Sequence, residues 1–248
     1  MSLRKSIHNV YRRIQGIIVP KLQYSQYLYE DILKSYVHHD TNKWLDLGCG
    51  RSILPSWRSD EEERLVKKCS TVVGIDYDLH SLKDHNGISL KIRGNISKLP
   101  FKDNSFDLAT ANMVVEHLDN PEVQIREVNR ILRSGGIFIF HTPNVISYSV
   151  IIGRLLPNIL KDKLAYILQG RKDDDIFDTY YRANSRKRIT RLAKINGFDV
   201  IKTKMIVSSA VFAIIPPLAI VELIWIRILM TKLFRQFRTN IVAILKKQ

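Results

Sequence analysis

The sequence predicts an α/β fold in which a mainly parallel β-sheet is covered by helices on both faces. Short apolar runs alternate with segments of helical periodicity through the middle of the chain. The 248 residues suit one hydrophobic core with elaborations. A hydrophobic share of 45% and a charged share of 25% are ordinary for a globular protein and argue against disorder or a polytopic membrane protein.

Seven segments are expected to form strands, and the first of them is a short apolar run typical of a strand buried on both faces. The segments cover residues 43–47, 71–76, 88–94, 106–111, 137–142, 197–204 and 240–245. The first five alternate with helical segments, so most of the sheet is expected to be parallel.

The helices follow from start and stop signals. Ser59 and Glu62 have the spacing of a capping box and predict a helix of about ten residues. A short helix is expected over residues 78–84.

A longer helix is expected over residues 121–132. Asn120 is its expected cap, Pro121 its first residue, and Gly135 and Gly136 its stop.

The carboxyl ends of neighbouring parallel strands meet at one edge of such a sheet, where ligands bind. Asp46 precedes the turn Gly48-Cys49-Gly50, whose glycines would let a ligand approach the backbone closely. The turn is not a dinucleotide fingerprint, because that pattern needs a glycine where Ile53 stands. A tight connection without a ligand is the alternative.

Two more polar residues end strands at the same edge. Asp76 closes the second strand, where a carboxylate can accept hydrogen bonds from both hydroxyls of a ribose. Asn95 follows the third strand and offers a donor and an acceptor to a base edge. Taken singly, each could be a cap or turn residue.

These residues belong to an ordered set of motifs that resembles class I S-adenosylmethionine-dependent methyltransferases, in the group that includes the ubiquinone-biosynthesis O-methyltransferases. A later turn, Asn196-Gly197-Phe198, also resembles the family. The main motifs are Trp44-Leu45-Asp46-Leu47-Gly48-Cys49-Gly50, Val73-Gly74-Ile75-Asp76, Leu99-Pro100-Phe101, Asn104-Ser105-Phe106-Asp107, Val115-Glu116-His117-Leu118, Arg130-Ile131-Leu132-Arg133-Ser134-Gly135-Gly136 and Thr142-Pro143-Asn144.

The resemblance implies a seven-stranded Rossmann-like sheet with an antiparallel last strand, and S-adenosyl-L-methionine as cofactor. Asp46 and the turn after it would hold the methionine portion, Asp76 the ribose and Tyr77 the adenine, while Asn112 would lie near the sulfonium. The implied cofactor-binding residues are Asp46, Gly48, Cys49, Gly50, Asp76, Tyr77, Asn95, Ile96 and Asn112.

This sequence departs from the family pattern at two positions. Ser52 replaces the third glycine of the first motif, and Asn95 replaces the acid usual before the adenine contact. Since Asn95 can still hydrogen-bond an exocyclic amine, weaker rather than absent cofactor binding is expected.

A hydroxyl acceptor would need a base, and His117, just after the fourth strand, is the candidate catalytic residue. A structural role in orienting its loop is the alternative. Some relatives hold a divalent metal with Glu-x-x-Glu-His, but Met113 stands in place of the first carboxylate here. Glu116, His117 and His141 make an incomplete metal-ligand set, so metal-free transfer is favoured.

Charge and the chain ends favour an anionic partner. Against 24 acidic residues there are 39 Lys and Arg residues, a net charge of +15. Residues 1–40 predict a helical extension with amphipathic spacing before a methyltransferase domain over residues 41–248. This extension could lie on a membrane or pack on the domain with a solvated basic face.

Two insertions point to a hydrophobic acceptor. Residues 145–184 are expected to form a helical cap over the acceptor pocket. Residues 205–237 are strongly apolar but interrupted by Pro216-Pro217 and Glu222, which predicts an interfacial or re-entrant helical hairpin. The basic residues 227–238 could bind anionic lipid head groups, and a buried helix pair or a dimer surface is the alternative.

Taken together, the sequence predicts a peripherally membrane-associated cytoplasmic enzyme that methylates an oxygen of a hydrophobic or lipid-linked small molecule or glycan. Two cysteines, Cys49 and Cys69, without metal-ligand spacing fit a reducing compartment. An RNA methyltransferase, which the net charge permits, and a catalytically silent scaffold are the alternatives.

Overall fold

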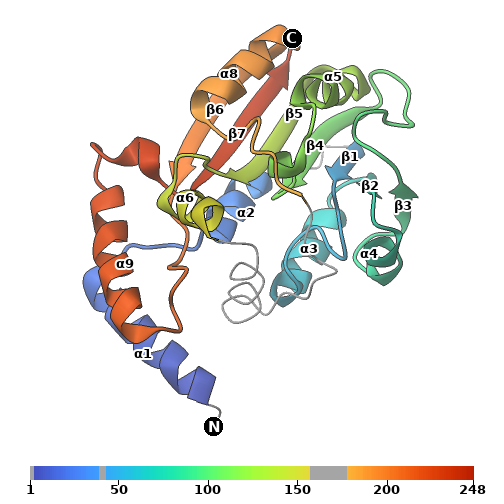
Figure 1. The fold of residues 1–248 in the computed structure, drawn as a ribbon. Helices are drawn as coiled ribbons and strands as arrows, with labels where there is room; N and C mark the ends of the chain where they lie inside the picture. Colours follow the sequence, from blue (N-terminus) through green and yellow to red (C-terminus); the bar gives the residue numbers. More distant parts are fainter. Residues whose placement is uncertain (1–2, 39–42, 157–177) are drawn as a thin grey trace. The chain divides into compact units, whose positions relative to one another are not determined.

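The computed structural model describes residues 3–38, 43–156 and 178–248, with side chains from residue 6 onward (Figure 1). The chain forms two compact units. The larger unit comprises residues 29–142, 179–204 and 241–248, and the smaller comprises residues 1–28, 143–178 and 205–240.

A seven-stranded sheet in the order β3-β2-β1-β4-β5-β7-β6 forms the centre of the larger unit. The strands β1 to β5 pair in parallel, and the last strands are antiparallel, which confirms the predicted fold class. The strands are β1 Lys43–Leu47, β2 Thr71–Asp76, β3 Leu90–Arg93, β4 Phe106–Asn112, β5 Leu132–Pro143, β6 Phe198–Ile206 and β7 Asn240–Lys247.

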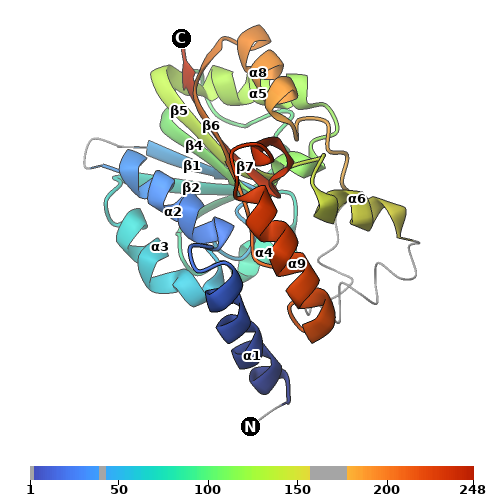
Figure 2. The same cartoon turned by 90° about the vertical axis from the view of Figure 1, so that its left-hand side faces the viewer.

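Helices cover both faces of this sheet. Figure 2 shows α5 and α8 together on one side and α3 on the other. The core between them is apolar, as the continuous runs require, and Trp44, Ile75, Leu108 and Phe138 are among its fully or nearly fully buried side chains. The helical elements are α2 Ser25–Tyr36, which begins in the smaller unit, η1 Ser56–Arg58, α3 Ser59–Val66, α4 Leu79–Asp84, η2 Val115–His117, α5 Pro121–Ile131 and α8 Arg186–Ile195.

The capping box predicted at Ser59 is absent. Ser59 lies inside α3, and its predicted partner Glu62 is buried instead, where its Oε2 accepts the N–H of Leu54 at 2.8 Å. The Glu62 side chain therefore ties α3 to the loop after β1 and does not cap its own helix.

The predicted stop of α5 is also wrong. The helix ends at Ile131, and Leu132 already pairs with Phe106 as the first residue of β5. The pairing of β4 with β5 shifts register just after this point, and Gly135 adopts a φ of 76°. The two glycines therefore accommodate a bulge inside a strand. Asn120 occupies the cap position of α5, but its side chain makes no cap hydrogen bond.

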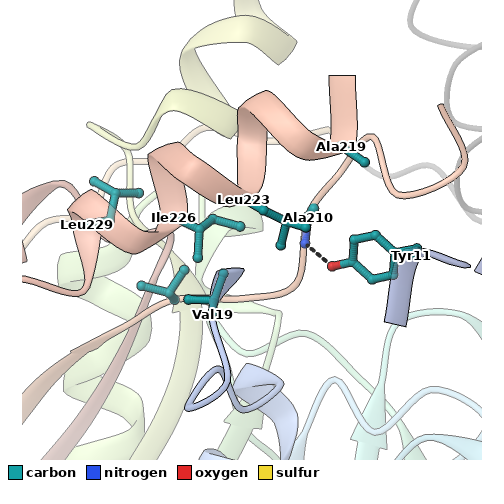
Figure 3. Packing of buried hydrophobic residues seen from close by; sticks show 8 residues of the cluster. Tyr11, Val19, Ala210, Ala219, Leu223, Ile226 and Leu229 are labelled. Carbon is teal, nitrogen blue, oxygen red and sulfur yellow. Dashed lines mark hydrogen bonds between the residues drawn. The ribbon is translucent and has the colours of Figure 1, made fainter. Parts of the chain in front are cut away.

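The smaller unit contains α1 Leu3–Ile18, α6 Tyr148–Leu155, α9 Pro216–Leu229 and η4 Arg235–Phe237. The helices α1 and α9 lie side by side (Figures 1 and 2). Tyr11 lies at their junction and accepts the N–H of Ala210 at 3.2 Å (Figure 3). The buried cluster between them consists of Tyr11, Val19, Val207, Ala210, Ala219, Leu223, Ile226 and Leu229.

The segment 205–237 contains the single α-helix α9 and no helical hairpin. Pro216 and Pro217 begin α9 and do not break it, because proline at the first helical positions gives up no intrahelical hydrogen bond. In the described ranges, no helix combines the length and the hydrophobicity needed to cross a bilayer. The expected cap over residues 145–184 is described only at α6 and after residue 177, since residues 157–177 lie outside the described ranges.

Candidate functional site

The turn after β1 is held by hydrogen bonds from its own backbone. The N–H groups of Gly48 and Cys49 both donate to the carbonyl oxygen of Ile75, at 2.8 and 3.2 Å. The Gly50 N–H donates to Asp76 Oδ2 at 2.8 Å. Since all three donors are used within the protein, a ligand at this turn would meet its carbonyl oxygens and the space beside Gly50.

Glycine is required at position 48 and leaves space at position 50. Both residues have a positive φ, of 64° and 51°. A Cβ added at Gly48 would lie 2.5 Å from Val114 Cγ2, whereas one added at Gly50 would meet no atom within 4 Å. The loop after β4 therefore packs on Gly48, and the turn is open at Gly50.

Asp76 at the end of β2 joins two loops. Besides accepting from Gly50 through Oδ2, its Oδ1 accepts the N–H of Asp78 at 2.8 Å. Each carboxylate oxygen can accept a second hydrogen bond, so the same side chain could still receive both hydroxyls of a ribose.

Asp46 is buried below the turn, where the Thr110 hydroxyl donates to its Oδ1. Trp44 Nε1 donates to the same Thr110 oxygen at 2.7 Å, so the hydroxyl proton is directed at the carboxylate. Burial raises the pKa of Asp46, and the nearby Glu62 and Asp76 raise it further against the effect of Thr110. Asp46 forms no ion pair with any described residue, so a ligand cation would relieve this cost.

The Cys49 side chain faces the sheet. It packs against Gly74, where an added Cβ would lie 2.6 Å from Cys49 Sγ. Burial, followed by the charges of Asp46 and Asp76, raises the pKa of the Cys49 thiol. Cys49 therefore has the environment of an inert packing residue and not of a nucleophile.

The residues expected around the adenine lie at the ends of β2 and β3. Tyr77 is 67% exposed, and the Arg93 guanidinium carbon lies 5.7 Å from the centre of its ring. Asn95 Oδ1 accepts the N–H of Ser97 at 2.8 Å, the pattern of a turn. Ile96 beside it is half-buried. Tyr77 therefore has a larger exposed surface at this end of the site than the half-buried Ile96.

Asn112 at the end of β4 is oriented by His141 on the neighbouring strand. His141 Nδ1 lies 3.0 Å from Asn112 Oδ1, and the imidazole stacks on Tyr29 of α2 with 5.6 Å between ring centres. Burial lowers the pKa of His141 to about 4, so the ring is neutral at pH 7. Because a carbonyl oxygen only accepts, Nδ1 carries the proton in this arrangement.

Glu116 and His117 have different surroundings although they are adjacent in η2. Glu116 is buried, and its Oε2 accepts the Thr142 hydroxyl at 2.9 Å, while Asn184 donates to the same Thr142 oxygen at 2.6 Å. His117 is half-buried, and its backbone N–H donates to Val114 at 2.9 Å. Among the described residues, no group of three His, Cys, Asp or Glu side chains is placed to hold a metal ion.

Two residues that contribute to this edge were not anticipated from the sequence. They are Thr110, which fixes Asp46, and Tyr29, which packs on His141. The sequence signal for Thr110 is a threonine in the middle of an expected strand, because a hydroxyl that is buried there, as this one is, needs a partner. Tyr29 had no such signal, because its partner is far away in the sequence.

The donor set fits S-adenosylmethionine. Asp46 and Asp76 lie at the ends of adjacent parallel strands, so one edge of the sheet presents two carboxylates. A ligand with an ammonium group, a sulfonium and a ribose diol would supply the cations and hydroxyl donors that these carboxylates can receive. The open turn at Gly50 and the exposed Tyr77 ring give room for the nucleoside.

Comparisons with known proteins agree with this site. Residues 45–140 match the family model described as a methyltransferase domain. A curated protein of Mycolicibacterium smegmatis named "Probable S-adenosylmethionine-dependent methyltransferase" is 32% identical over 42% of this chain and 39% of its own length. A demethylmenaquinone methyltransferase of Corynebacterium kroppenstedtii is 30% identical over 48% of this chain and 52% of its own length. The chain thus spans about half or less of these relatives.

A solved structure shows the same fold. The S-adenosylmethionine-dependent methyltransferase of Mesorhizobium loti superimposes with a TM-score of 0.56, at 18% identity, over 88% of this chain and 96% of its own. The family match covers β1 to β5, which carry both strand-end carboxylates. On the family model and the fold, residues 45–140 are similar to methyltransferase domains, and the chain shares the fold of S-adenosylmethionine-dependent methyltransferases.

Proposed function

We propose that this chain transfers the methyl group of S-adenosylmethionine to an oxygen atom of a hydrophobic or lipid-linked acceptor at the cytoplasmic surface of a membrane. The observation that carries the cofactor part is the hydrogen bond from Gly50 to Asp76. It holds a carboxylate against an open turn at the switch in strand order between β1 and β4, where doubly wound sheets bind nucleosides.

The bound cofactor would supply an activated methyl group on a sulfonium. The chain's part is to hold an acceptor oxygen in line with that carbon, about 3–3.5 Å away, and to exclude water. Asp46 would offset the positive charge of the ligand, and Asp76 would accept the ribose hydroxyls. Asn112, whose carboxamide is fixed by His141, would orient the end of the ligand nearest the acceptor.

His117 is the proposed base. As the new O–C bond forms and the C–S bond breaks, a hydroxyl acceptor must lose its proton, and a half-buried imidazole could take it. The neighbouring Glu116 carboxylate is unsuited to this role because it accepts the Thr142 hydroxyl inside the protein.

Support for a hydrophobic acceptor comes from the smaller unit and from one relative. Many apolar side chains of α9 are exposed, including Val221 and Ile224. One of the curated relatives is named a demethylmenaquinone methyltransferase, although this chain covers only 52% of it. Both observations favour an apolar acceptor over RNA.

Calorimetry on the full chain tests the cofactor part. S-adenosylmethionine and S-adenosylhomocysteine should both bind, and Asp76→Ala should reduce the affinity by about tenfold or more, because the ribose hydroxyls would lose a charged acceptor. A chain that binds neither compound would be a scaffold with the fold alone.

A second experiment tests the acceptor. Incubation with methyl-labelled S-adenosylmethionine and a lipid extract should place the label in an apolar fraction, and His117→Gln should slow labelling by about a hundredfold without changing cofactor affinity. Labelling of RNA, with binding that weakens steeply as salt rises, would replace the proposed acceptor by a nucleic acid.

A further inference from the structure

The helix α9 has apolar side chains on two opposite sides. One side carries Leu223, Ile226 and Leu229 into the buried cluster shared with α1 (Figure 3). The opposite side presents Val221, Ile224, Trp225 and Ile228 to solvent, spaced three and four residues apart. A helix that is apolar all round is normally covered on all sides, so this outer side is suited to a partner.

The same apolar surface continues beyond the end of α9. Trp225 packs against Phe234 with 6.1 Å between ring centres, and Phe234 lies 6.4 Å from Phe237. Leu233 beside them is 81% exposed. We call the exposed side chains Val221, Ile224, Trp225, Ile228, Leu233 and Phe237 the outer face of α9.

The charges around the outer face have one sign. Glu222 is the sole acidic residue in the sequence of residues 205–240, and its carboxylate is buried. There it accepts the Tyr148 hydroxyl at 2.6 Å and the N–H groups of Val211 and Phe212 at 2.7 and 2.8 Å. The exposed charges near the outer face are therefore cations.

Two of these cations alternate with the exposed apolar residues. Lys232 and Arg235 are exposed and lie on either side of Leu233 in the sequence. Arg238 has a different role, because it donates to the carbonyl oxygens of Leu229 and Met230 and so caps the end of α9. Lys232 and Arg235 are thus the basic residues best placed to meet an anionic surface.

We propose that the outer face of α9 inserts into the interfacial layer of an anionic lipid bilayer, with Lys232 and Arg235 at the head groups. Apolar and aromatic side chains bordered by cations are the pattern of interfacial membrane binding. A symmetric dimer through this face would bring cations together without an acid to pair them, which disfavours a second copy of the chain. The inference rests on the proposed function only in that the function would explain why the protein binds a membrane. Binding to a bilayer itself requires neither cofactor nor acceptor.

Flotation of the full chain with vesicles tests this proposal. Vesicles of equal parts phosphatidylcholine and phosphatidylglycerol should bind the protein, and Ile224→Gln with Leu233→Gln should weaken binding by about tenfold or more. The matched control is Ile195→Gln with Leu90→Gln in the larger unit, because Ile195 and Ile224 are each 50% exposed. Equal losses from the two pairs would overturn the proposal.

A charge test uses the same vesicles. Lys232→Glu with Arg235→Glu should weaken binding by about tenfold or more. Lys187→Glu with Arg191→Glu, two exposed basic residues of α8, should change it much less. If the two α8 substitutions weaken vesicle binding equally, binding is diffuse attraction to a cationic protein and the proposed surface is wrong.

Depth and oligomeric state complete the test. In a Trp57→Phe background the remaining exposed tryptophan is Trp225, since Trp44 is buried, and brominated lipids should quench it. Fluorescence that brominated lipids leave unchanged would contradict insertion. Sedimentation that shows a dimer which Ile224→Gln with Leu233→Gln dissociates, with vesicle binding intact, would assign the outer face to a second copy. Cofactor affinity measured on the same variants keeps this outcome separate from failure of the proposed function.

Discussion

Gly50 donates its N–H to Asp76 Oδ2 at 2.8 Å, which fastens the turn after β1 to the end of β2. The carboxylate expected to receive a ribose is thus also part of the scaffold that shapes the turn. The ligand-binding role and the scaffold role of Asp76 can be tested separately. The reason is that its other oxygen, Oδ1, accepts from a different donor, the N–H of Asp78.

Asp76→Asn should weaken S-adenosylmethionine binding by about tenfold or more while the protein stays folded. The amide would place an NH₂ group against either Gly50 or Asp78, both of which already donate, and a lost hydrogen bond to a charged group is worth about 1.5–3 kcal/mol. Calorimetry measures the affinity. Asp78→Asn is the control, since Asp78 caps α4 by accepting from His80 and Ser81 and should affect stability more than binding.

Gly48→Ala and Gly50→Ala should have different effects although both glycines have a positive φ. Alanine at 48 should lower the free energy of unfolding by about 2–4 kcal/mol, because its Cβ would overlap Val114. Alanine at 50 should cost about 1–2 kcal/mol of stability, since its Cβ meets open space, but should reduce cofactor affinity. Urea unfolding and calorimetry distinguish the two.

A rescue variant checks the reason given for Gly48. Val114→Ala should restore part of the stability of Gly48→Ala, because it removes both methyl groups that the new Cβ would meet. If the double variant is no more stable than expected from the two single changes, the cost at position 48 comes from the backbone conformation alone.

The strands β1 and β2 could be predicted to the residue, whereas β5 begins five residues earlier than predicted and the contacts between distant segments could not be predicted. The runs Lys43–Leu47 and Thr71–Asp76 have the predicted bounds, because strands buried on both faces leave a continuous apolar signal that ends in polar or glycine residues. The predicted capping role of Glu62 is wrong because its partner, the Leu54 N–H, lies outside its own helix. Local spacing contains no information about such a donor.

The candidate site likewise has residues that the sequence predicts and contacts that it does not. Asp46, Asp76 and the glycine turn could be found because strand ends and turns are visible in the sequence. The contact of Tyr29 with His141 joins residues more than a hundred positions apart, and no local pattern predicts it. The predicted helix break at Pro216-Pro217 is wrong for a related reason: proline can end one helix or begin another, and the surrounding chain decides which.

His141 should make stability depend on pH between about 4 and 6.5. Burial lowers the His141 pKa from 6.5 to about 4, so in this window the unfolded chain binds more protons than the folded chain. Stability therefore rises with pH through the window, by at most about 1.4 kcal/mol per pH unit for this group, and the contribution is complete above pH 6.5. Urea unfolding at several pH values measures the slope.

His141→Gln should reduce that slope without abolishing it. His85, whose pKa burial also lowers to about 4, contributes in the same direction and remains. Asp46 acts oppositely, because its raised pKa makes stability fall as pH rises above the unfolded value of 3.8, so the comparison with the unchanged chain isolates His141. A variant with the same slope as the unchanged chain would show that His141 titrates alike in both states.

The Glu222 carboxylate should stabilise the smaller unit, although it is a buried polar group. Its carboxylate accepts three donors, from Tyr148 and from the backbone of Val211 and Phe212, and so ties α9 to α6 and to the segment before α9. Glu222→Gln would replace one acceptor oxygen with an NH₂ group that faces a donor, and we expect a loss of about 1–3 kcal/mol in the free energy of unfolding.

Tyr148→Phe removes one donor only and should cost about 1 kcal/mol. When Tyr148→Phe is combined instead with Glu222→Ala, which removes both acceptor oxygens, the costs should fall short of their sum, since both changes remove the same hydrogen bond. Additive costs in thermal or urea unfolding would mean that the Tyr148 hydroxyl and Glu222 do not interact.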